Sequence, residues 1–287
     1  MPRISETDLI LNPDGSVYHL SLQPKHLADT IIAVGDPGRV YLVSKFFDEV
    51  EMEVNQREFI THTGRYKGKR ITVISTGIGT DNVEIVFTEL DALANIDLKT
   101  REPKSRKKKL KIVRIGTSGA LQEDIPVGAH LVSDYAVGLD NLLSFYDLPM
   151  DDFEAGLALD LQRKTGLPFM PYVAKGSDAL RDQVGKGMTV GNTLTCPGFY
   201  APQGRQVRIP ARFPNLLEDL NYYHKGDFWL TNFEMETSAY YALGKLMGHE
   251  VISTNAIIAN RIKGRFAKNH QEVVESLIQK VLNNLLT

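Results

Sequence analysis

Apolar and polar positions alternate along this chain in short blocks, and the blocks predict strands and helices in turn. Continuous runs rich in β-branched residues predict buried strands at 30–34, 59–66, 69–75, 112–115, 130–137, 189–195 and 251–259. Apolar residues spaced three or four apart predict helices at 40–47, 82–94, 178–186, 234–248 and 271–286. Because strands and helices follow one another, the sequence predicts an α/β fold with a mostly parallel or mixed sheet. No linker, repeat or change in composition indicates a second domain, so we expect a single domain over residues 1–287.

Composition and charge narrow the class of protein. With 287 residues, of which 43% are hydrophobic, the chain can bury a core of its own. A net charge of −2 provides no general attraction to nucleic acids or anionic membranes, so neither is expected as a partner. The single cysteine, Cys196, excludes an internal disulfide framework and is typical of a reducing compartment. The polar first residues predict no signal peptide, and no stretch approaches the roughly 20 apolar residues of a membrane span, so we expect a soluble, cytoplasmic protein.

Residues 99–111 stand apart because they hold eight lysines or arginines and only one glutamate. Such a run can be an arm that binds nucleic acid, or a solvated loop between a helix and the next strand. Segments that bind nucleic acid commonly carry aromatic residues for base stacking, and none interleave with these charges. The solvated loop is therefore the favoured interpretation.

A buried strand that carries an arginine is the strongest chemical signal in the chain. The run Lys111–Leu121 places Arg114 among apolar residues and then reads Gly116-Thr117-Ser118-Gly119, which we interpret as a loop. A guanidinium cannot lose its charge, so its burial is costly unless an anion meets it. The small residues beyond it could add N–H groups and hydroxyls around the same anion, an arrangement that suits a phosphate. The alternative is an arginine paired with a structural carboxylate beside a glycine turn.

Two further glycine loops follow predicted strands. Gly35-Asp36-Pro37-Gly38-Arg39 opens a helix, whose N-terminus favours an anion, and Arg39 could close on that anion. Thr76-Gly77-Ile78-Gly79-Thr80 lacks the spacing of a dinucleotide fingerprint but could line a pocket at the strand ends. Ordinary turns are the alternative at both places.

Two polar clusters could bind a sugar and a planar base. Glu234-Met235-Glu236 places two carboxylates at a predicted helix start, where they either accept hydrogen bonds from sugar hydroxyls or simply complement the helix dipole. Gln203 and Arg205 are two residues apart and so point the same way in an extended loop. Their donors and acceptor match a planar imide, on which Phe199 could stack. The alternative is a polar surface loop.

Taken together and in order, these motifs resemble the nucleoside phosphorylase-I family, and within it the uridine phosphorylases most closely. The matching stretches are Val17-Tyr18-His19-Leu20, Gly35-Asp36-Pro37-Gly38-Arg39, Arg57-Glu58-Phe59, Ser75-Thr76-Gly77-Ile78-Gly79, Arg114-Ile115-Gly116-Thr117-Ser118-Gly119, Gln203-Gly204-Arg205 and Phe233-Glu234-Met235-Glu236. Each is short, but seven in the family's order cover nearly the whole chain. The resemblance implies a single α/β domain in which a mixed, twisted sheet forms a distorted, partly closed barrel flanked by helices.

The resemblance also implies a role for individual residues. It assigns the phosphate site to Gly35, Arg39, Arg114 and Thr117, with Arg57 contributed by a neighbouring subunit. It assigns the ribose to Met235 and Glu236, with His19 of the neighbour on the 5′-hydroxyl, and the uracil ring to Phe199, Gln203 and Arg205. Because such active sites are shared, a homodimer would be the minimal working unit, and bacterial members of the family usually form hexamers.

The implied reaction is reversible phosphorolysis of uridine to uracil and ribose-1-phosphate in pyrimidine salvage. Inorganic phosphate would be the co-substrate, no cofactor is implied, and deoxyuridine and thymidine are further candidate substrates. Purine-cleaving relatives usually carry an aspartate in a Ser-Asp-His stretch after the last strand, where this chain has Ala259-Asn260-Arg261. The alternatives are a purine nucleoside phosphorylase, a nucleosidase that uses water, and a nucleoside-binding sensor. The phosphate arginines argue against the nucleosidase, and the complete set of site residues argues against the sensor.

Three departures from the family pattern bear on these implications. Residues 99–111 are longer than the equivalent turn in close relatives. Gly204 stands where a glutamate is common, which adds flexibility to the loop. Some relatives bind a monovalent cation through a glutamate, an isoleucine carbonyl and a serine, and the matching positions here are Glu58, Ile78 and Asn82, so the last ligand differs.

Overall fold

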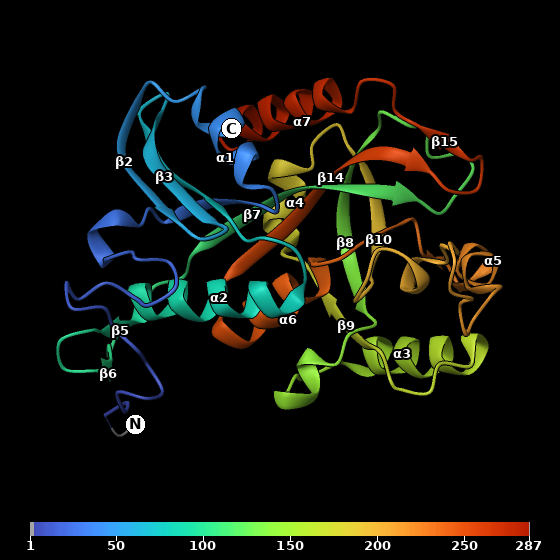
Figure 1. Ribbon diagram of the computed structural model, residues 1–287, viewed down its shortest axis with the longest axis horizontal. Coiled ribbons are helices and arrows are strands. Elements are labelled where there is room, and N and C mark those ends of the chain that lie inside the picture. The colour runs from blue at the N-terminus through green and yellow to red at the C-terminus, as the bar shows by residue number, and fades with distance from the viewer. Residues whose placement is uncertain (1–2, 287) are drawn as a thin grey trace. The chain divides into compact units, whose positions relative to one another are not determined.

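Strands and helices alternate through residues 3–286, the part of the chain that the computed structural model describes (Figure 1). The chain forms two compact units. The first unit runs as far as Val113 and takes in Met247–Glu250, and the second comprises Arg114–Leu246 and the chain from Val251 onward. Each unit is described by itself, and the single domain expected over residues 1–287 stays a prediction. Among the described residues, no helix has the length and apolar character needed to cross a membrane.

The first unit contains a mixed sheet in the order β2-β3-β4-β1. Its elements are η1 (Pro24–His26), β1 (Thr30–Val34), α1 (Pro37–Ser44), β2 (Glu49–Gln56), β3 (Phe59–Tyr66), β4 (Lys69–Ser75), α2 (Thr80–Asn95), β5 (Ile96–Asp97) and β6 (Glu102–Pro103). Strand β1 is buried along its whole length and lies parallel to β4, whereas β3 is antiparallel to both β2 and β4. The predicted turn between β3 and β4 is confirmed, because Lys67 and Gly68 both have positive φ, as a tight two-residue hairpin requires.

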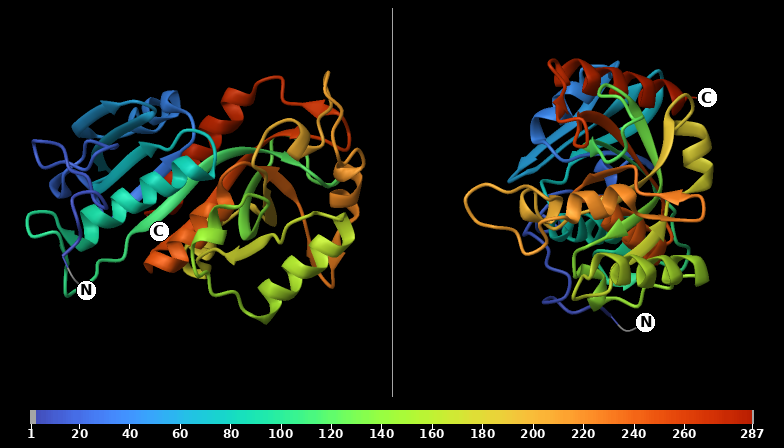
Figure 2. Two further views of the ribbon diagram at one scale, coloured as in Figure 1. Left: turned by 60° about the horizontal axis from the view of Figure 1, so that its bottom comes forward. Right: turned by 90° about the vertical axis from the view of Figure 1, so that its right-hand side faces the viewer.

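The second unit is built on a closed barrel (Figures 1 and 2). Its strands are β7 (Lys111–Ala120, of which the first three residues belong to the first unit), β8 (His130–Gly138), β9 (Tyr172–Lys175), β10 (Thr189–Thr195), β11 (His224–Lys225), β12 (Phe228–Trp229), β13 (Asn232–Glu234), β14 (Glu250–Asn260) and β15 (Arg265–Phe266). The order β14-β8-β10-β13-β7 closes because β14 also pairs with β7. Strand β10 is parallel to β8 and β13, while the pairs β13–β7 and β14–β8 are antiparallel. The predicted mixed sheet and barrel are therefore confirmed.

Helices cover this barrel in the second unit (Figure 2). They are η2 (Leu142–Phe145), α3 (Asp152–Thr165), α4 (Asp178–Val184), η3 (Ala201–Gln203), α5 (Leu216–Tyr222), α6 (Thr237–Met247) and α7 (His270–Asn284). Helix α3 packs against β9, and α4 packs against β8 and α7. Helix α6 is buried from Thr237 to Gly244, which fixes the backbone just before it as part of the core.

The predicted bounds hold best for strands flanked by clear turns. The predictions at 30–34, 59–66, 69–75 and 189–195 coincide with β1, β3, β4 and β10. The predicted loop at residues 116–119 is wrong, because β7 continues to Ala120. A Cβ on Gly116 would overlap Arg114 Nη1, and one on Gly119 would lie 3.3 Å from the Phe233 ring. These glycines therefore leave space for neighbouring side chains and do not form a turn.

The basic segment 99–111 closes the C-terminus of α2. Lys104 Nζ donates to the carbonyl of Ala94 at 2.9 Å, and Lys107 Nζ donates to that of Asn95 at 3.4 Å. The side chain of Asn95 in turn bonds the backbone of Lys108 through both of its amide atoms. Cations are favourable at a helix C-terminus, where carbonyl groups lack intrahelical partners. The lysines thus have a structural role at the end of this helix.

Candidate active site

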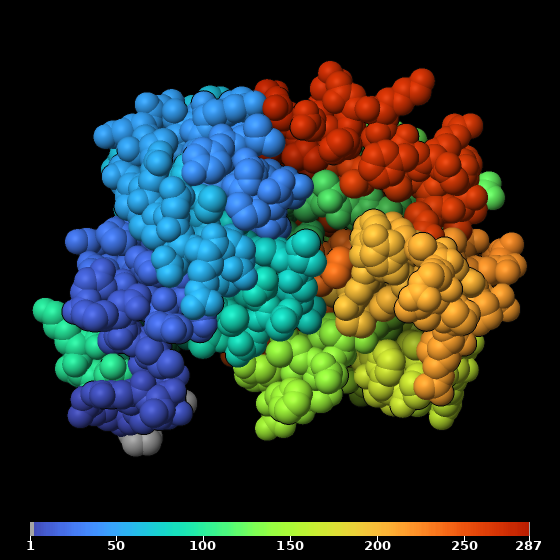
Figure 3. Space-filling model, in the orientation of Figure 1, coloured from blue at the N-terminus to red at the C-terminus, as the bar shows by residue number. Residues whose placement is uncertain are grey.

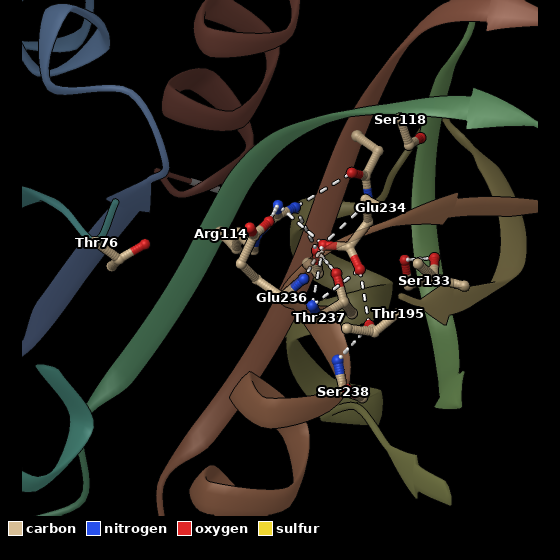
Figure 4. Close-up of polar contacts among 12 residues, drawn as sticks. Thr76, Arg114, Ser118, Ser133, Thr195, Glu234, Glu236, Thr237 and Ser238 are labelled. Carbon is tan, nitrogen blue, oxygen red and sulfur yellow. Dashed lines mark hydrogen bonds and ion pairs between the residues drawn. The ribbon is translucent and has the colours of Figure 1, made fainter. Parts of the chain in front are cut away.

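Arg114 is the centre of a buried ionic cluster in the second unit (Figure 4). Its Nη2 donates to Glu236 Oε2 at 2.6 Å and lies 2.9 Å from Glu234 Oε2, while Nη1 donates to Asn255 Oδ1 at 3.2 Å. Burial by itself would lower the pKa of Arg114, but the two carboxylates outweigh it and hold that pKa above its usual value. The sequence left phosphate and carboxylate open as partners of this guanidinium, and the structure supplies carboxylates.

The position of this guanidinium depends on the strand that carries it. The side chain of Arg114 lies along β7 over Gly116, two residues further on, where any larger residue would displace it. Its guanidinium carbon also lies 5.8 Å from the ring centre of Tyr240, a fully buried residue of α6. The charge is therefore held in one orientation by packing as well as by ion pairs.

The two glutamates near α6 have different tasks. The predicted helix at 234–248 is wrong at its start, because Glu234 ends β13 and α6 begins at Thr237. The Glu234 carboxylate accepts hydrogen bonds from the N–H groups of Glu236 and Thr237, at 2.9–3.0 Å, and from Thr195 Oγ1 at 2.7 Å. It therefore satisfies N–H groups at the helix start, as the dipole interpretation expects. Glu236 instead faces Arg114, with Met235 half-buried between the two glutamates.

The three residues predicted to hold a base lie together on one surface loop of the second unit (gold in Figure 3). Arg205 Nη1 donates to Gln203 Oε1 at 2.5 Å and to the carbonyl of Phe199 at 2.6 Å. The Arg205 guanidinium carbon lies 3.7 Å from the centre of the Phe199 ring, which is half exposed. Gly204 has a φ of 66°, a left-handed conformation that glycine adopts without strain. The loop thus brings a buried amide, a guanidinium and a half-exposed aromatic ring within a few ångströms of one another.

A second arginine at this loop was not singled out as a site residue from the sequence. Arg261 Nη1 donates to the carbonyl of Gln203 at 3.1 Å, and its guanidinium lies 5.5 Å from the Phe233 ring centre. Arg205 approaches the same ring at 5.9 Å. Burial and the charge of Arg261 lower the pKa of Arg205 to about 10, and burial lowers the pKa of Arg261 as well. The only sequence signal was its place directly after the last long strand.

In the first unit, the two predicted glycine loops pack on each other. A Cβ on Gly35 would lie 3.3 Å from the carbonyl oxygen of Gly77, so the loops approach to backbone contact. They follow β1 and β4, whose parallel pairing brings their carboxyl ends to one edge of the sheet. Asp36 caps α1 by accepting from the N–H of Gly38 at 2.9 Å, and Arg39 lies half-buried in the first turn of that helix.

The remaining predicted residues lie apart from these loops along the chain. Arg57 is exposed in the turn between β2 and β3 and has a φ of 53°, a conformation that is uncommon outside glycine and often marks a functional position. His19 precedes η1, and its side chain is 31% exposed. Thr117 lies half-buried on β7, three residues beyond Arg114. Contribution of Arg57 and His19 to a neighbouring subunit stays a prediction.

The three positions that match a cation site lie close together. Asn82 Nδ2 donates to the carbonyl oxygen of Ile78 at 3.3 Å, and Glu58 and Asn82 both lie against Gly77. A monovalent cation at these positions stays a prediction. Within residues 3–286, no group of three His, Cys, Asp or Glu side chains could hold a metal.

Comparison with known proteins places this geometry in a family. The sequence model of the Phosphorylase superfamily matches residues 29–287. The uridine phosphorylase of Thermococcus kodakarensis is 30% identical over 262 residues, which cover 89% of this chain and 81% of that protein. The DeoD-type purine nucleoside phosphorylase of Bacillus cytotoxicus is 26% identical over 267 residues, which cover 92% of this chain and 96% of that protein.

A solved structure agrees with these relatives. The nucleoside phosphorylase of Trypanosoma brucei, which shows uridine phosphorylase activity, is 29% identical, and it matches with a TM-score of 0.89 over 97% of this chain and 99% of that one. The α/β fold predicted from the sequence is thus a nucleoside phosphorylase fold. Since the family match extends from residue 29 to residue 287 and sequence relatives and a solved structure agree with it, this chain belongs to the phosphorylase superfamily.

Proposed function

We propose that this chain is a uridine phosphorylase, which splits uridine reversibly with inorganic phosphate into uracil and ribose-1-phosphate. The observation that carries the proposal is the loop on which Gln203 and Arg205 contact each other beside the exposed ring of Phe199. Uracil is a planar imide whose carbonyl oxygens and N–H match an amide and a guanidinium. The named activities of the Thermococcus and Trypanosoma relatives support the same substrate.

The charges on this loop suit the leaving group. When the bond between C1′ and N1 breaks, uracil N1 keeps the electron pair and negative charge spreads to its carbonyl oxygens. Arg205 and Arg261 lie near one ring, and each has a lowered pKa, so an anion between their guanidinium groups would relieve an unfavourable arrangement of charge. Stabilisation that grows as the charge develops lowers the barrier rather than only tightening substrate binding.

The buried cluster suits the ribose and the attacking phosphate. Glu236 would accept hydrogen bonds from the 2′- and 3′-hydroxyls, with Met235 against the sugar, while Arg114 keeps the Glu236 carboxylate in place. A phosphate oxygen forms the new bond to C1′, and the dianion stabilises the positive charge that develops on the ribose. We assign phosphate binding to Gly35, Arg39, Arg114 and Thr117, together with Arg57 of a neighbouring subunit.

A purine nucleoside phosphorylase is the second candidate, because such an enzyme is also among the relatives. The position where purine-cleaving relatives carry an aspartate is close to Asn260. Asn260 Nδ2 donates to the carbonyls of Gln122 and Ile125 at 2.8 and 2.9 Å, so this side chain is engaged within the fold. It offers no carboxyl group to a purine, which favours the pyrimidine.

Further parts of the proposal concern assembly and conditions. Shared sites would make a homodimer the minimal working unit and a hexamer the expected assembly, in a cytoplasmic enzyme of pyrimidine salvage. Deoxyuridine and thymidine are further candidate substrates. The mechanism needs no cation in any step, and a monovalent cation at Glu58, Ile78 and Asn82 is a separate prediction in which the Asn82–Ile78 hydrogen bond would compete with the ion.

The test is uracil release from uridine by the purified protein, with and without inorganic phosphate and with inosine in parallel. Uracil release that requires phosphate, with no cleavage of inosine, is the expected result. Release without phosphate would identify a nucleosidase, cleavage of inosine would identify a purine enzyme, and no release from either nucleoside would point to a sensor.

A further inference from the structure

Glu89 is a buried carboxylate that the proposed mechanism does not use. It lies in the middle of α2 and is only 7% exposed, which is costly for a charged group unless hydrogen bonds compensate. Its hydrogen-bond partners among the described residues come from one short segment about 70 residues earlier in the chain. The N–H of His19 donates to both carboxylate oxygens at 2.9 and 3.1 Å, and the N–H of Leu20 donates to Oε2 at 2.8 Å.

The same carboxylate also bonds the imidazole of His19. Nδ1 of His19 lies 2.7 Å from Glu89 Oε1. An ionised carboxylate can only accept hydrogen bonds, so Nδ1 must carry the proton. Nε2 is then the ring nitrogen left to accept a hydrogen bond, and within the described part of the chain it has no hydrogen-bond partner.

The surroundings leave this ring little freedom. Tyr18 meets the imidazole edge-on, with ring centres 4.8 Å apart, and Leu20, the next residue along the chain, is fully buried. Backbone and ring are thus both fixed by a single buried side chain, yet 31% of the His19 side chain is exposed. Folding of this segment does not require that a partly exposed imidazole be held in one orientation, so the fixed ring indicates a role in binding.

We infer that Glu89 is a positioning residue, which holds His19 so that Nε2 meets the 5′-hydroxyl of the nucleoside. The inference rests on the proposed function, in which His19 serves the active site of a neighbouring subunit. Glu89 itself touches no substrate. Its carboxylate decides which ring nitrogen carries the proton and which way the ring points, as hydrogen-bond partners on the other ring nitrogen do for functional histidines in general.

The test compares uridine with 5′-deoxyuridine, which lacks the hydroxyl in question, in the oligomeric enzyme. Glu89→Gln puts an NH2 group against N–H donors and should turn the ring away. We expect it to lower kcat/KM for uridine by about tenfold, the worth of one hydrogen bond of about 1.4 kcal/mol, and to leave kcat/KM for 5′-deoxyuridine within about twofold. His19→Ala should give the same pattern, and the double variant should lose no more than either single one.

Asp91→Asn is the matched control, because Asp91 lies on the same helix and its carboxylate faces another histidine, His249, at 3.3 Å. It should leave the ratio between the two nucleosides unchanged. An equal loss on both nucleosides in Glu89→Gln would overturn the inference and leave Glu89 a structural residue. A wild-type enzyme that acts on neither nucleoside would refute the proposed function instead.

A second measurement does not depend on the variant folding. In the wild-type protein labelled with ¹⁵N-histidine, the His19 resonances, assigned by their loss in His19→Ala, should show a protonated Nδ1. An unprotonated Nδ1 would overturn the inference, since Glu89 could not then receive its hydrogen bond.

Discussion

Two arginine clusters in the second unit differ in whether carboxylates balance their positive charge. Arg114 is buried between Glu234 and Glu236, and these carboxylates raise its pKa. Arg205 and Arg261 lie at the base loop, where neither pairs with a carboxylate among the described residues, and each has a lowered pKa. The charge of the first cluster is balanced by carboxylates within the protein, whereas the charged form of the second is stabilised when an anion binds.

The difference indicates how one active site divides its work. A cation whose charge is already matched can orient a substrate-binding carboxylate, here Glu236, before any ligand binds. Cations without matched charge destabilise the empty loop slightly and stabilise charge that appears on the leaving group. The comparison therefore predicts that substitutions in the first cluster lower the free energy of unfolding, whereas substitutions in the second mainly lower the rate of catalysis.

The largest effect is expected from Arg114→Ala. This change leaves two carboxylates buried without their cation, which costs about 3–5 kcal/mol of unfolding free energy, and it should abolish phosphorolysis of uridine. Urea denaturation and a uracil-release assay measure the two losses. Arg114→Lys, which keeps the charge but not the planar fork, should recover part of the stability. A stable Arg114→Ala protein would contradict this prediction and show that the fold does not depend on these ion pairs.

Arg205→Ala should act on catalysis and hardly on stability. Loss of a cation that meets the developing charge should lower kcat for uridine by about 10²-fold or more, with unfolding free energy changed by less than about 1 kcal/mol. Arg212→Ala is the control, because Arg212 lies on the same stretch of chain and its guanidinium stacks near the ring of Phe213, away from the base-loop contacts. Near wild-type turnover in Arg205→Ala would remove this residue from the base site.

Gly116→Ala tests the packing that orients Arg114. The added Cβ overlaps Arg114 Nη1, so we expect a loss of about 1–3 kcal/mol in unfolding free energy together with reduced uridine turnover. Gly156→Ala in α3 is the matched control, since its Cβ would meet only the flexible end of Lys225 at 2.9 Å. Equal stability of the two variants would show that the guanidinium can move aside freely.

The smallest effect concerns monovalent cations. Because Asn82 donates to the carbonyl of Ile78, exchange of sodium for potassium or choline at constant ionic strength should change uridine turnover by no more than about twofold. Asn82→Ser frees that carbonyl and could create a dependence that the wild type lacks. Saturable activation of the wild type by potassium would contradict this prediction.

Sequence patterns predicted strands better than the parts between them. Strand β2 was missed because most of its residues are polar and exposed, and α3 was missed as well, although its capping box of Asp151 and Glu154 is visible afterwards. Gly116 and Gly119 were interpreted as a loop because the sequence does not distinguish a glycine that forms a turn from one that leaves space for a bulky neighbour. The neighbours that decide between the two, Arg114 and Phe233, are known only from the fold.

The sequence by itself determined where most of the long buried strands lie along the chain, the list of chemical groups and the family that this list resembles. Only the tertiary structure decided which groups pair. Arg114 and Glu236 are 122 residues apart, Glu89 and His19 are 70 apart, and Arg261 meets the base loop from 58 residues away. Hydrophobic periodicity reports the local conformation of a segment, whereas the partner of a buried charge depends on how distant strands align. That alignment placed Glu234 against the N–H groups at the start of α6 and brought both Glu234 and Glu236 to Arg114.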